Sequence, residues 1–398
     1  MSSSAGASSS RHTVIEEAGS QSMAVPAKSS LGEIFQLFLR LGLTAFGGPA
    51  AHIVLMEREA VERRGWMSHE DFLDLVGACN LLPGPGSTQV AMALGYSRCG
   101  WLGLVVAGGC FILPASLATL ALAWAYVRYG SLVQVQGLLY GAKPVMVAII
   151  VQAVWNLGKT AYRRWQMAAA GLVCFVAALA GIPPIAVLLA SGGLTLLTAW
   201  PRFRRGAVMG FAGLPLAAGG TASTAGVASI FLVFLKLGVV VFGSGYVLVA
   251  FLKADLVDRL HWVTQRQLLD AITAGQVTPG PVFATATFLG YLLHGWIGAA
   301  VATAAIFLPS FFMAGVVGAL AERIRTSRLA AAFLNGVNAA AVALMAAVAI
   351  ALGRATLVDG WTLALGLASA ILLVRYKINA TWLILGGAGL GILLQGLS

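Results

Sequence analysis

The chain has 398 residues, of which 59% are hydrophobic and 10% are charged, whereas about 25% of residues are charged in an average soluble domain. This composition excludes an ordinary soluble protein, because 25 Lys and Arg and 14 Asp and Glu residues could not keep so much apolar surface in water. We therefore expect an integral membrane protein. The apolar runs are continuous and do not alternate with a period of two, which excludes a transmembrane β-barrel and leaves helices to cross the membrane.

The formal net charge of +11 does not indicate a nucleic-acid partner, because 22 of the 25 basic residues lie in gaps between apolar runs. Such a distribution is typical of loops that stay on the cytoplasmic side of a membrane. No nucleic-acid-binding module is recognisable. The four cysteines have neither a CxxC spacing nor neighbouring histidines, so we expect no metal site and no cofactor.

Residues 1–30 are rich in Ser and Ala and lack an apolar core, so we expect a disordered tail and no secretory signal peptide. After them, apolar segments long enough to span or half-span a bilayer alternate with charged gaps. These segments are residues 34–56, 72–97, 101–127, 137–157, 166–182, 184–200, 227–251, 268–293, 296–321, 329–353, 360–374 and 380–397.

The two halves of the chain repeat the same motifs. Ile34–Gly47 matches Ile230–Gly243 at an offset of 196, with eight identities in 14 positions. The matches continue in the same order to Gly141 and Gly336, where the offset is 195. We therefore predict an all-α polytopic membrane protein made by tandem duplication. Its expected parts are the tail 1–30, a first repeat 31–205, a Gly/Ala-rich linker 206–225 with room for an extra crossing, and a second repeat 226–398.

A Pro-Gly-Pro sequence interrupts one apolar segment in each repeat, at Pro83-Gly84-Pro85 and at Pro279-Gly280-Pro281. Proline removes amide donors and disfavours helix at the residue before it. Two topologies fit such a segment: a broken helix that spans, with six crossings in each repeat, or a re-entrant hairpin, with five. Both give repeats of inverted topology, an architecture of many secondary transporters, with a site where the two breaks meet near the midplane.

Three basic residues lie inside apolar runs: Arg40, Lys236 and Lys143. A charge at the bilayer centre costs about 2.5–3.5 kcal/mol on insertion scales, so each needs a partner or a function. Arg40 and Lys236 occupy the same place in both repeats, which favours anion binding over a structural ion pair. Lys143 has no basic counterpart, because Asn338 takes its place, and we weigh substrate contact and an ion pair equally.

The breaks supply groups that suit an anion. A new half-helix follows each one, and its unpaired amides and positive dipole end attract negative charge. A packing kink is the alternative interpretation of a single Gly/Pro pair. Nearby glycines would let the backbone approach a ligand, and two amide side chains lie just before the breaks. These further candidates are Gly47, Gly48, Pro49, Gly243, Ser244, Asn80 and Gln276.

Acidic residues are scarce in the apolar segments. Asp74 and Asp270 begin the two broken segments, and they fit either proton coupling or the common use of acidic residues at helix starts. Glu59 and Asp255 lie in charged connectors and are interpreted as members of solvated ion pairs. No Ser/His/Asp set, HExxH sequence or Walker loop is visible, so we predict a protein that is not an enzyme and that uses ion gradients.

Several motifs resemble the two-domain type of the chromate ion transporter family. They are FGGPAAHI (Phe46–Ile53), LLPGPGSTQVAMALGY (Leu81–Tyr96), FGSGYVLVAFL (Phe242–Leu252), GQVTPGPVFATATFLGY (Gly275–Tyr291), IFLPSF (Ile306–Phe311) and NGVNAAAVAL (Asn335–Leu344). The resemblance covers about residues 31–353. It implies a multi-pass carrier of the inner membrane that exports chromate, driven by the proton gradient or the membrane potential, with sulfate as a structural mimic.

Energetics also favours export. A dianion that leaves an inside-negative cell gains about 4.6 kcal/mol per 100 mV, twice the value for one charge. Uptake or exchange of sulfate or another tetrahedral oxyanion is the nearest alternative, and a membrane scaffold without transport is an alternative of another class. The expected partners are chromate, sulfate as its competitor and the lipid bilayer, and the oligomeric state is left open, with a homodimer as one candidate.

Overall fold

The computed structural model describes residues 30–162, 165–199, 225–242, 245–325, 328–376 and 378–396. Within these ranges the chain is almost entirely helical, and the β structure is limited to an isolated antiparallel bridge between Pro83 and Phe242. The predicted all-α fold is therefore confirmed. Residues 1–29 of the expected tail and residues 206–224 of the expected linker lie outside the described residues.

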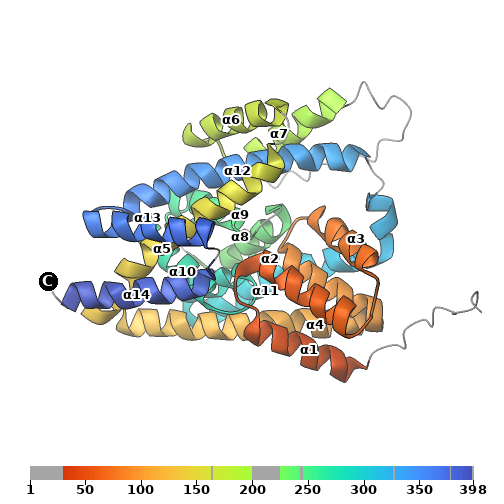
Figure 1. Ribbon diagram of the computed structural model, residues 1–398, viewed down its shortest axis with the longest axis horizontal. Helices are drawn as coiled ribbons and strands as arrows, with labels where there is room; N and C mark the ends of the chain where they lie inside the picture. The colour runs from red at the N-terminus through yellow and green to blue at the C-terminus, as the bar shows by residue number, and fades with distance from the viewer. Residues whose placement is uncertain are drawn as a thin grey trace, which may run out of the picture.

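The helices of the two repeats follow one another in corresponding order (Figure 1). The first repeat contains α1 (Leu31–Thr44), α2 (Gly48–Glu57), the π-helical turn η1 (Arg58–Arg63), α3 (His69–Asn80), α4 (Gly86–Tyr129), α5 (Val133–Ala161), α6 (Trp165–Leu179) and α7 (Pro184–Ala199). The second contains α8 (Val227–Val240), α9 (Val247–Leu252), the π-helical turn η3 (Lys253–Arg259), α10 (Gln265–Val277), the 3-10 turn η4 (Val282–Ala284), α11 (Thr285–Arg325), α12 (Arg328–Thr356), α13 (Gly360–Arg375) and α14 (Ala380–Gly396).

Several helices begin where the sequence supplies a capping side chain. The side chains of Ser30, Ser68, Thr264 and Asp359 each accept a hydrogen bond from the backbone N–H three residues later. These bonds satisfy one of the amides that a helix start leaves unpaired. They fix the first turns of α1, α3, α10 and α13.

Each repeat begins with a helical hairpin. The chain leaves α1 through Gly47 and Gly48, whose φ angles of 103° and 79° are accessible mainly to glycine. The following helix then runs back along α1, because Arg64 Nε lies 3.3 Å from Glu33 Oε1 at the open end of the hairpin. The apolar segment 34–56 is therefore two half-length helices, and α8 with α9 and η3 form the corresponding hairpin of the second repeat.

The Pro-Gly-Pro breaks also turn the chain back. A Cβ atom on Gly275, in α10, would lie against the side chain of Thr285, at the start of α11. Ten residues of straight helix would separate these positions by about 15 Å. The half-helices on the two sides of the break are therefore antiparallel, which favours the re-entrant hairpin over the broken spanning helix.

A second sharp reversal follows inside α4 and inside α11. The backbone leaves helical angles at Cys99 and Gly100, where φ of Gly100 is 60°. The short limb 86–98 packs against the long limb 101–129, and Gly95 and Gly103 let the two backbones touch. In α11 the same reversal occurs at His294 and Gly295, and each repeat thus gains one long limb.

The long limbs of α4 and α11 establish the inverted arrangement of the repeats. Gly315 of α11 lies against Trp101, at the start of the α4 limb, and Phe311 lies against Gly108 further along it. The two limbs are therefore antiparallel, although they occupy equivalent places in their repeats. Equivalent helices that pack antiparallel are related by a two-fold axis perpendicular to them. If both cross the bilayer, that axis lies in the membrane plane.

The ends of the repeats are exchanged. The last two helices of the second repeat, α13 and α14, pack on α5, and the last two of the first repeat, α6 and α7, pack on α12 (Figure 1). Four helical stretches of the described residues are long and apolar enough to cross a membrane, namely Gly86–Tyr129, Val133–Ala161, Val282–Val316 and Ala331–Thr356. Large apolar side chains such as Trp165, Leu197, Trp382 and Leu393 are exposed on the shorter helices, as expected for surfaces in contact with lipid.

Candidate functional site

Each Pro-Gly-Pro break is bound to the hairpin tip of the other repeat. The amide of Gly84 donates to the carbonyl oxygen of Val241 at 2.7 Å, and the amide of Gly280 donates to that of Ala45 at 2.9 Å. Gly84 and Gly280 are equivalent at the offset of 196, and so are Ala45 and Val241. The same contact is therefore made twice, once by each repeat. The structure thus brings together four irregular segments, two from each repeat, and their backbone groups form hydrogen bonds between the repeats.

These segments lie midway along the long limbs. Gly280 packs against Phe111 and Ala115 in the limb 101–129, and Gly84 packs against Ser310 in α11. Both glycines have positive φ angles, of 91° and 117°. Irregular backbone at this depth is tolerated where protein or water satisfies it, and the reciprocal hydrogen bonds provide that here.

Buried polar groups surround the first break. His52 Nδ1 lies 3.2 Å from the hydroxyl of Ser87, and His52 Nε2 lies 3.1 Å from the carbonyl oxygen of Ala45. The Gln89 amide donates to the carbonyl oxygen of Pro83 at 2.5 Å. Among the described residues, several buried groups near the breaks have no hydrogen-bond partner, and these are the hydroxyls of Thr88, Ser116 and Ser310 and the amide nitrogen of Gln276. Unsatisfied donors of this kind suit an oxyanion.

The remaining residues that the sequence predicted for the site differ in their contacts and in their exposure. Gly48 lies beside the hydroxyl of Tyr246, and Pro49 approaches Gly245. Asn80 is exposed, whereas Asp74 is partly buried. Gly243 and Ser244 lie outside the described residues.

Arg40 and Lys236 form matched ion pairs. Arg40 contacts Glu59, and Lys236 Nζ lies 2.8 and 3.0 Å from the two carboxylate oxygens of Asp255. The exposed fraction of the side chain is 51% for Arg40 and 9% for Lys236. Each pair joins the limbs of a hairpin, which is the structural use that the sequence analysis weighed against anion binding.

Glu59 is the acidic centre of the first hairpin. Besides Arg40 it contacts Arg64, and Arg63 Nη1 lies 2.8 Å from its Oε1. Burial alone raises the pKa of Glu59, but the hydrogen bond from Arg64 and the charges of Arg40 and Arg64 outweigh it and hold that pKa below its usual value. The sequence assigned Glu59 to a solvated pair, yet the residue is only 5% exposed.

Lys143 and Asp270 form a third ion pair, which joins the two repeats. Lys143 Nζ, from α5, lies 2.8 Å from Asp270 Oδ1, from α10. The hydroxyl of Tyr126 donates to Asp270 Oδ2 at 2.9 Å. Asp270 is 1% exposed, so two residues predicted separately, one as a substrate contact and one as a proton carrier, are direct partners.

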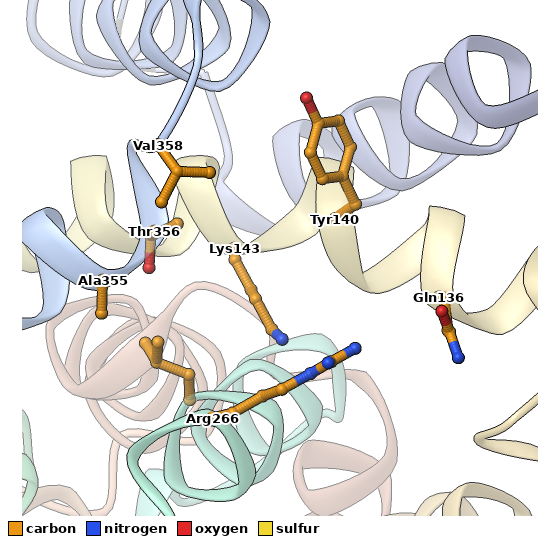
Figure 2. A pocket seen from close by; sticks show the side chains of 8 residues that line it. Gln136, Tyr140, Lys143, Arg266, Ala355, Thr356 and Val358 are labelled. Atoms are coloured by element: carbon orange, nitrogen blue, oxygen red, sulfur yellow. The ribbon is translucent and has the colours of Figure 1, made fainter. Parts of the chain in front are cut away.

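A cavity of about 290 Å³ opens beside this pair (Figure 2). It is lined by Gln136, Tyr140, Lys143, Arg266, Leu269, Ala355, Thr356 and Val358. Arg266 was not predicted, because in the sequence it belongs to a charged connector. The packing of α5 against α10, which belong to different repeats, brings it to the same cavity as Lys143. Among the described residues no cluster of His, Cys, Asp or Glu could hold a metal ion.

Comparison with known proteins identifies the family. The model of the chromate transporter family matches residues 32–196 and 228–392. A chromate transport protein of Cupriavidus metallidurans is 34% identical over 373 residues, 91% of this chain and 92% of that protein. A chromate transport protein of Pseudomonas aeruginosa is 34% identical over 84% of this chain and 83% of its own length. For a probable chromate transport protein of Synechococcus elongatus, the identity is 34% and the shares are 86% and 89%.

No solved structure matches the chain closely enough to be reported as similar. The two family matches coincide with the two structural repeats, and the predicted tandem duplication is confirmed. The chain belongs to the chromate transporter family.

Proposed function

We propose that the protein exports chromate across the inner membrane, driven by the membrane potential or the proton gradient, and that it gives resistance to chromate. The names of the relatives support chromate as the substrate. The observation that carries the proposal is the reciprocal contact between hairpin tips and breaks, at 2.7 and 2.9 Å, midway along the long limbs.

The proposed substrate site lies at these four segments. We assign its backbone groups to Gly47, Gly48 and Pro49 and to the breaks Pro83-Gly84-Pro85 and Pro279-Gly280-Pro281, with Asn80 and Gln276 beside them. From the sequence alone the proposal also includes Gly243 and Ser244, which lie outside the described residues. Half-helix starts and unpartnered hydroxyls would replace the water of an oxyanion that has been desolvated.

The two-fold relation of the repeats suggests how the site alternates between faces. The contact between a break and the hairpin tip of the other repeat exists twice. If one of these contacts breaks while the other is kept, the substrate site becomes accessible from one face of the membrane only. In the second conformation each repeat would adopt the conformation that the other repeat has in the first, as in other carriers made of inverted repeats.

Arg40, Lys236, Asp74 and Asp270 are assigned finer roles in this proposal. Arg40 and Lys236 supply positive charge near the path, where an anion would have to compete with Glu59 and Asp255 for them. Asp74 and Asp270 are the proposed proton carriers. Coupling to few protons agrees with export, because moving a dianion outward already gains about 4.6 kcal/mol per 100 mV.

The distribution of basic residues favours one orientation. The face where α2 ends carries Arg58, Arg63 and Arg64. By the positive-inside rule we place this face in the cytoplasm. The cavity beside Lys143 would then open on the outer face.

Radiolabelled chromate flux in proteoliposomes tests the proposal. With an inside-negative potential imposed by a potassium gradient, efflux should rise with the voltage, and a pH gradient should show whether protons contribute. Flux that is indifferent to both gradients, or absent, would contradict the proposal.

Sulfate transport is the second candidate, because sulfate is a tetrahedral dianion like chromate. Backbone amides and hydroxyls bind either anion and give little discrimination by themselves. A counterflow experiment in vesicles preloaded with sulfate or chromate decides between them: preference for sulfate at equal concentrations would reassign the substrate.

A further inference from the structure

The lining of the cavity beside Lys143 contains two cations, Lys143 and Arg266, and no carboxylate, while Asp359 lies behind the lining residue Tyr140, whose hydroxyl donates to it at 2.7 Å. Both oxygens of Asp270 are engaged, one by Lys143 and the other by Tyr126. In the described part of the chain, no carboxylate lies within ion-pair distance of Arg266. Lys143 is therefore paired with Asp270 while Arg266 has no carboxylate at ion-pair distance among the described residues, and an additional anion would be stabilised between the two cations.

The geometry of the cavity suits a small oxyanion. Figure 2 shows the amino group of Lys143 and the guanidinium of Arg266 extending into the same space from α5 and α10. The hydroxyl of Thr356, a residue only 6% exposed, lines the cavity and has no hydrogen-bond partner among the described residues. A guanidinium binds tetrahedral oxyanions through two parallel hydrogen bonds, and a hydroxyl can donate a third. A volume of about 290 Å³ lies below the range of typical drug-sized pockets.

The equivalent corner of the other repeat has the opposite charge. At the offsets of 195 and 196, Asn338 replaces Lys143 and Glu70 replaces Arg266, while Asp74 corresponds to Asp270. An anion would be repelled there. The pair of cations is therefore found in only one of these two equivalent corners, and the two-fold scaffold does not require it.

We propose that this cavity is a vestibule that binds tetrahedral oxyanion dianions on one face, and that the bound anion takes Lys143 from Asp270. The inference rests on the proposed function, because it gives that transporter a surface binding site for the same class of anion. Lys143 belongs to the first repeat and Asp270 to the second. The anion thus opens a bond that ties the repeats together, and the flexible stem of Lys143 lets its amino group move between the two partners.

Anion titration of the purified protein tests the vestibule. Sodium sulfate and sodium chromate are titrated in detergent at low chloride, and binding is measured by calorimetry. We expect Lys143→Gln and Arg266→Gln to weaken binding at least tenfold at this site, because each removes a cation that the anion needs. Asp270→Asn should tighten it several-fold, because the competing carboxylate is gone.

The matched controls are Asn338→Gln and Glu70→Gln, at the equivalent positions of the other corner, which should bind as the parent does. Because Lys143→Gln leaves Asp270 buried without its cation and can misfold, the double variant Lys143→Gln/Asp270→Asn is measured as well. This double variant has no unpaired buried charge at the two positions, so it should fold, and it should bind sulfate and chromate as weakly as Lys143→Gln. Parent-like affinity in this double variant, or in Arg266→Gln, would overturn the proposal.

A protection experiment separates the vestibule from the midplane site. In a cysteine-free variant, Gln136→Cys places a thiol in the cavity lining, and Ala331→Cys places one at the equivalent exposed position of α12. Sulfate should slow the reaction of a charged thiol reagent with Cys at position 136 several-fold and leave position 331 unchanged. Equal rates with and without sulfate at position 136 would overturn the vestibule.

The two proposals fail in different ways. Chromate flux in the parent together with no protection at position 136 would overturn the vestibule and leave chromate transport standing. Protection at position 136 together with no chromate flux would overturn chromate transport and support an anion site in the cavity.

Discussion

The two equivalent corners of the molecule differ in charge, although the scaffold around them is the same. One holds Lys143, Asp270 and Arg266, and the other holds Asn338, Asp74 and Glu70. By contrast, the hairpin ion pairs Arg40–Glu59 and Lys236–Asp255 persist in both repeats, each between residues 19 positions apart. Duplication therefore preserved the contacts that hold the hairpins, and the sequences diverged at the surface where an anion would arrive.

The breaks show a smaller difference of the same kind. Gly84 faces the hydroxyl of Ser310, whereas Gly280 faces the methyl group of Ala115 at the corresponding place. Both glycines keep positive φ angles and the same cross-repeat hydrogen bond. The backbone architecture is thus two-fold, whereas the side chain that faces the break glycine is polar at the first break and apolar at the second.

The largest expected effect concerns the two-fold relation itself, on which this comparison depends. Single cysteines at Glu62 and at Asp258, exposed in equivalent connectors, should react with a membrane-impermeant thiol reagent from opposite faces in a cysteine-free variant. The reason is the antiparallel packing of the α4 and α11 limbs. Intact vesicles of both orientations provide the measurement, and labelling of both positions from one face would contradict the inverted repeats.

The second test asks whether a side chain at either break glycine reduces chromate transport equally. Gly84→Leu and Gly280→Leu should each reduce chromate flux to a few per cent or less, because a side chain is strained at positive φ and would collide with Gln89 and Ser310 or with Ala115. Flux is compared with protein yield and monodispersity after purification.

Gly109→Leu is the control for these variants, because it lies in the α4 limb with open space beside it. It should transport as the parent does. Normal flux in either break variant would leave that break as a packing kink.

The third test compares the two hairpin ion pairs. Lys236→Gln leaves the buried Asp255 with Arg259, at 3.2 Å, as its one remaining cationic partner among the described residues, and should cost about 3–5 kcal/mol of stability. Arg40→Gln should cost about 1 kcal/mol or less, because Arg40 is half exposed and Glu59 keeps Arg63 and Arg64. Thermal unfolding in detergent measures both.

The same variants test the prediction that Lys236 binds the anion. The double variant Lys236→Gln/Asp255→Asn removes both charges and should regain stability, yet bind chromate at least tenfold more weakly than the parent. If it binds chromate like the parent, Lys236 serves the hairpin alone.

The sequence predicted the helical class, the duplication and the breaks, because each leaves a local signal: long apolar runs, a constant offset, and prolines beside glycine. It did not show that segment 34–56 folds back at Gly47. Gly47 and Gly48 were recognised as places of close backbone approach, but an apolar run of this length fits one crossing as well as two half-helices.

The partners of the buried charges were harder to predict. Lys143 and Asp270 are more than 120 residues apart, and they meet only because α5 and α10 cross between repeats. Arg40 and Lys236 were interpreted from their equivalence alone. Their acidic partners were visible at matched positions, yet the spacing of 19 residues has no meaning in a single helix and becomes a contact only in a hairpin.

The smallest expected effect concerns Glu59, the acidic centre of the first hairpin. Because the arginines hold the pKa of Glu59 below its ordinary value of 4.5, which we take for the unfolded chain, the stability that this residue contributes is complete above that unfolded value. It is lost as the pH falls through the lower pKa of the folded state. Glu59→Gln should therefore unfold at a lower temperature than the parent at pH 7, and the difference should shrink as the pH decreases below the unfolded pKa and through the lower folded one. Melting temperatures of parent and variant across this range give the comparison, and a difference that stays constant with pH would show that Glu59 contributes by packing and not by charge.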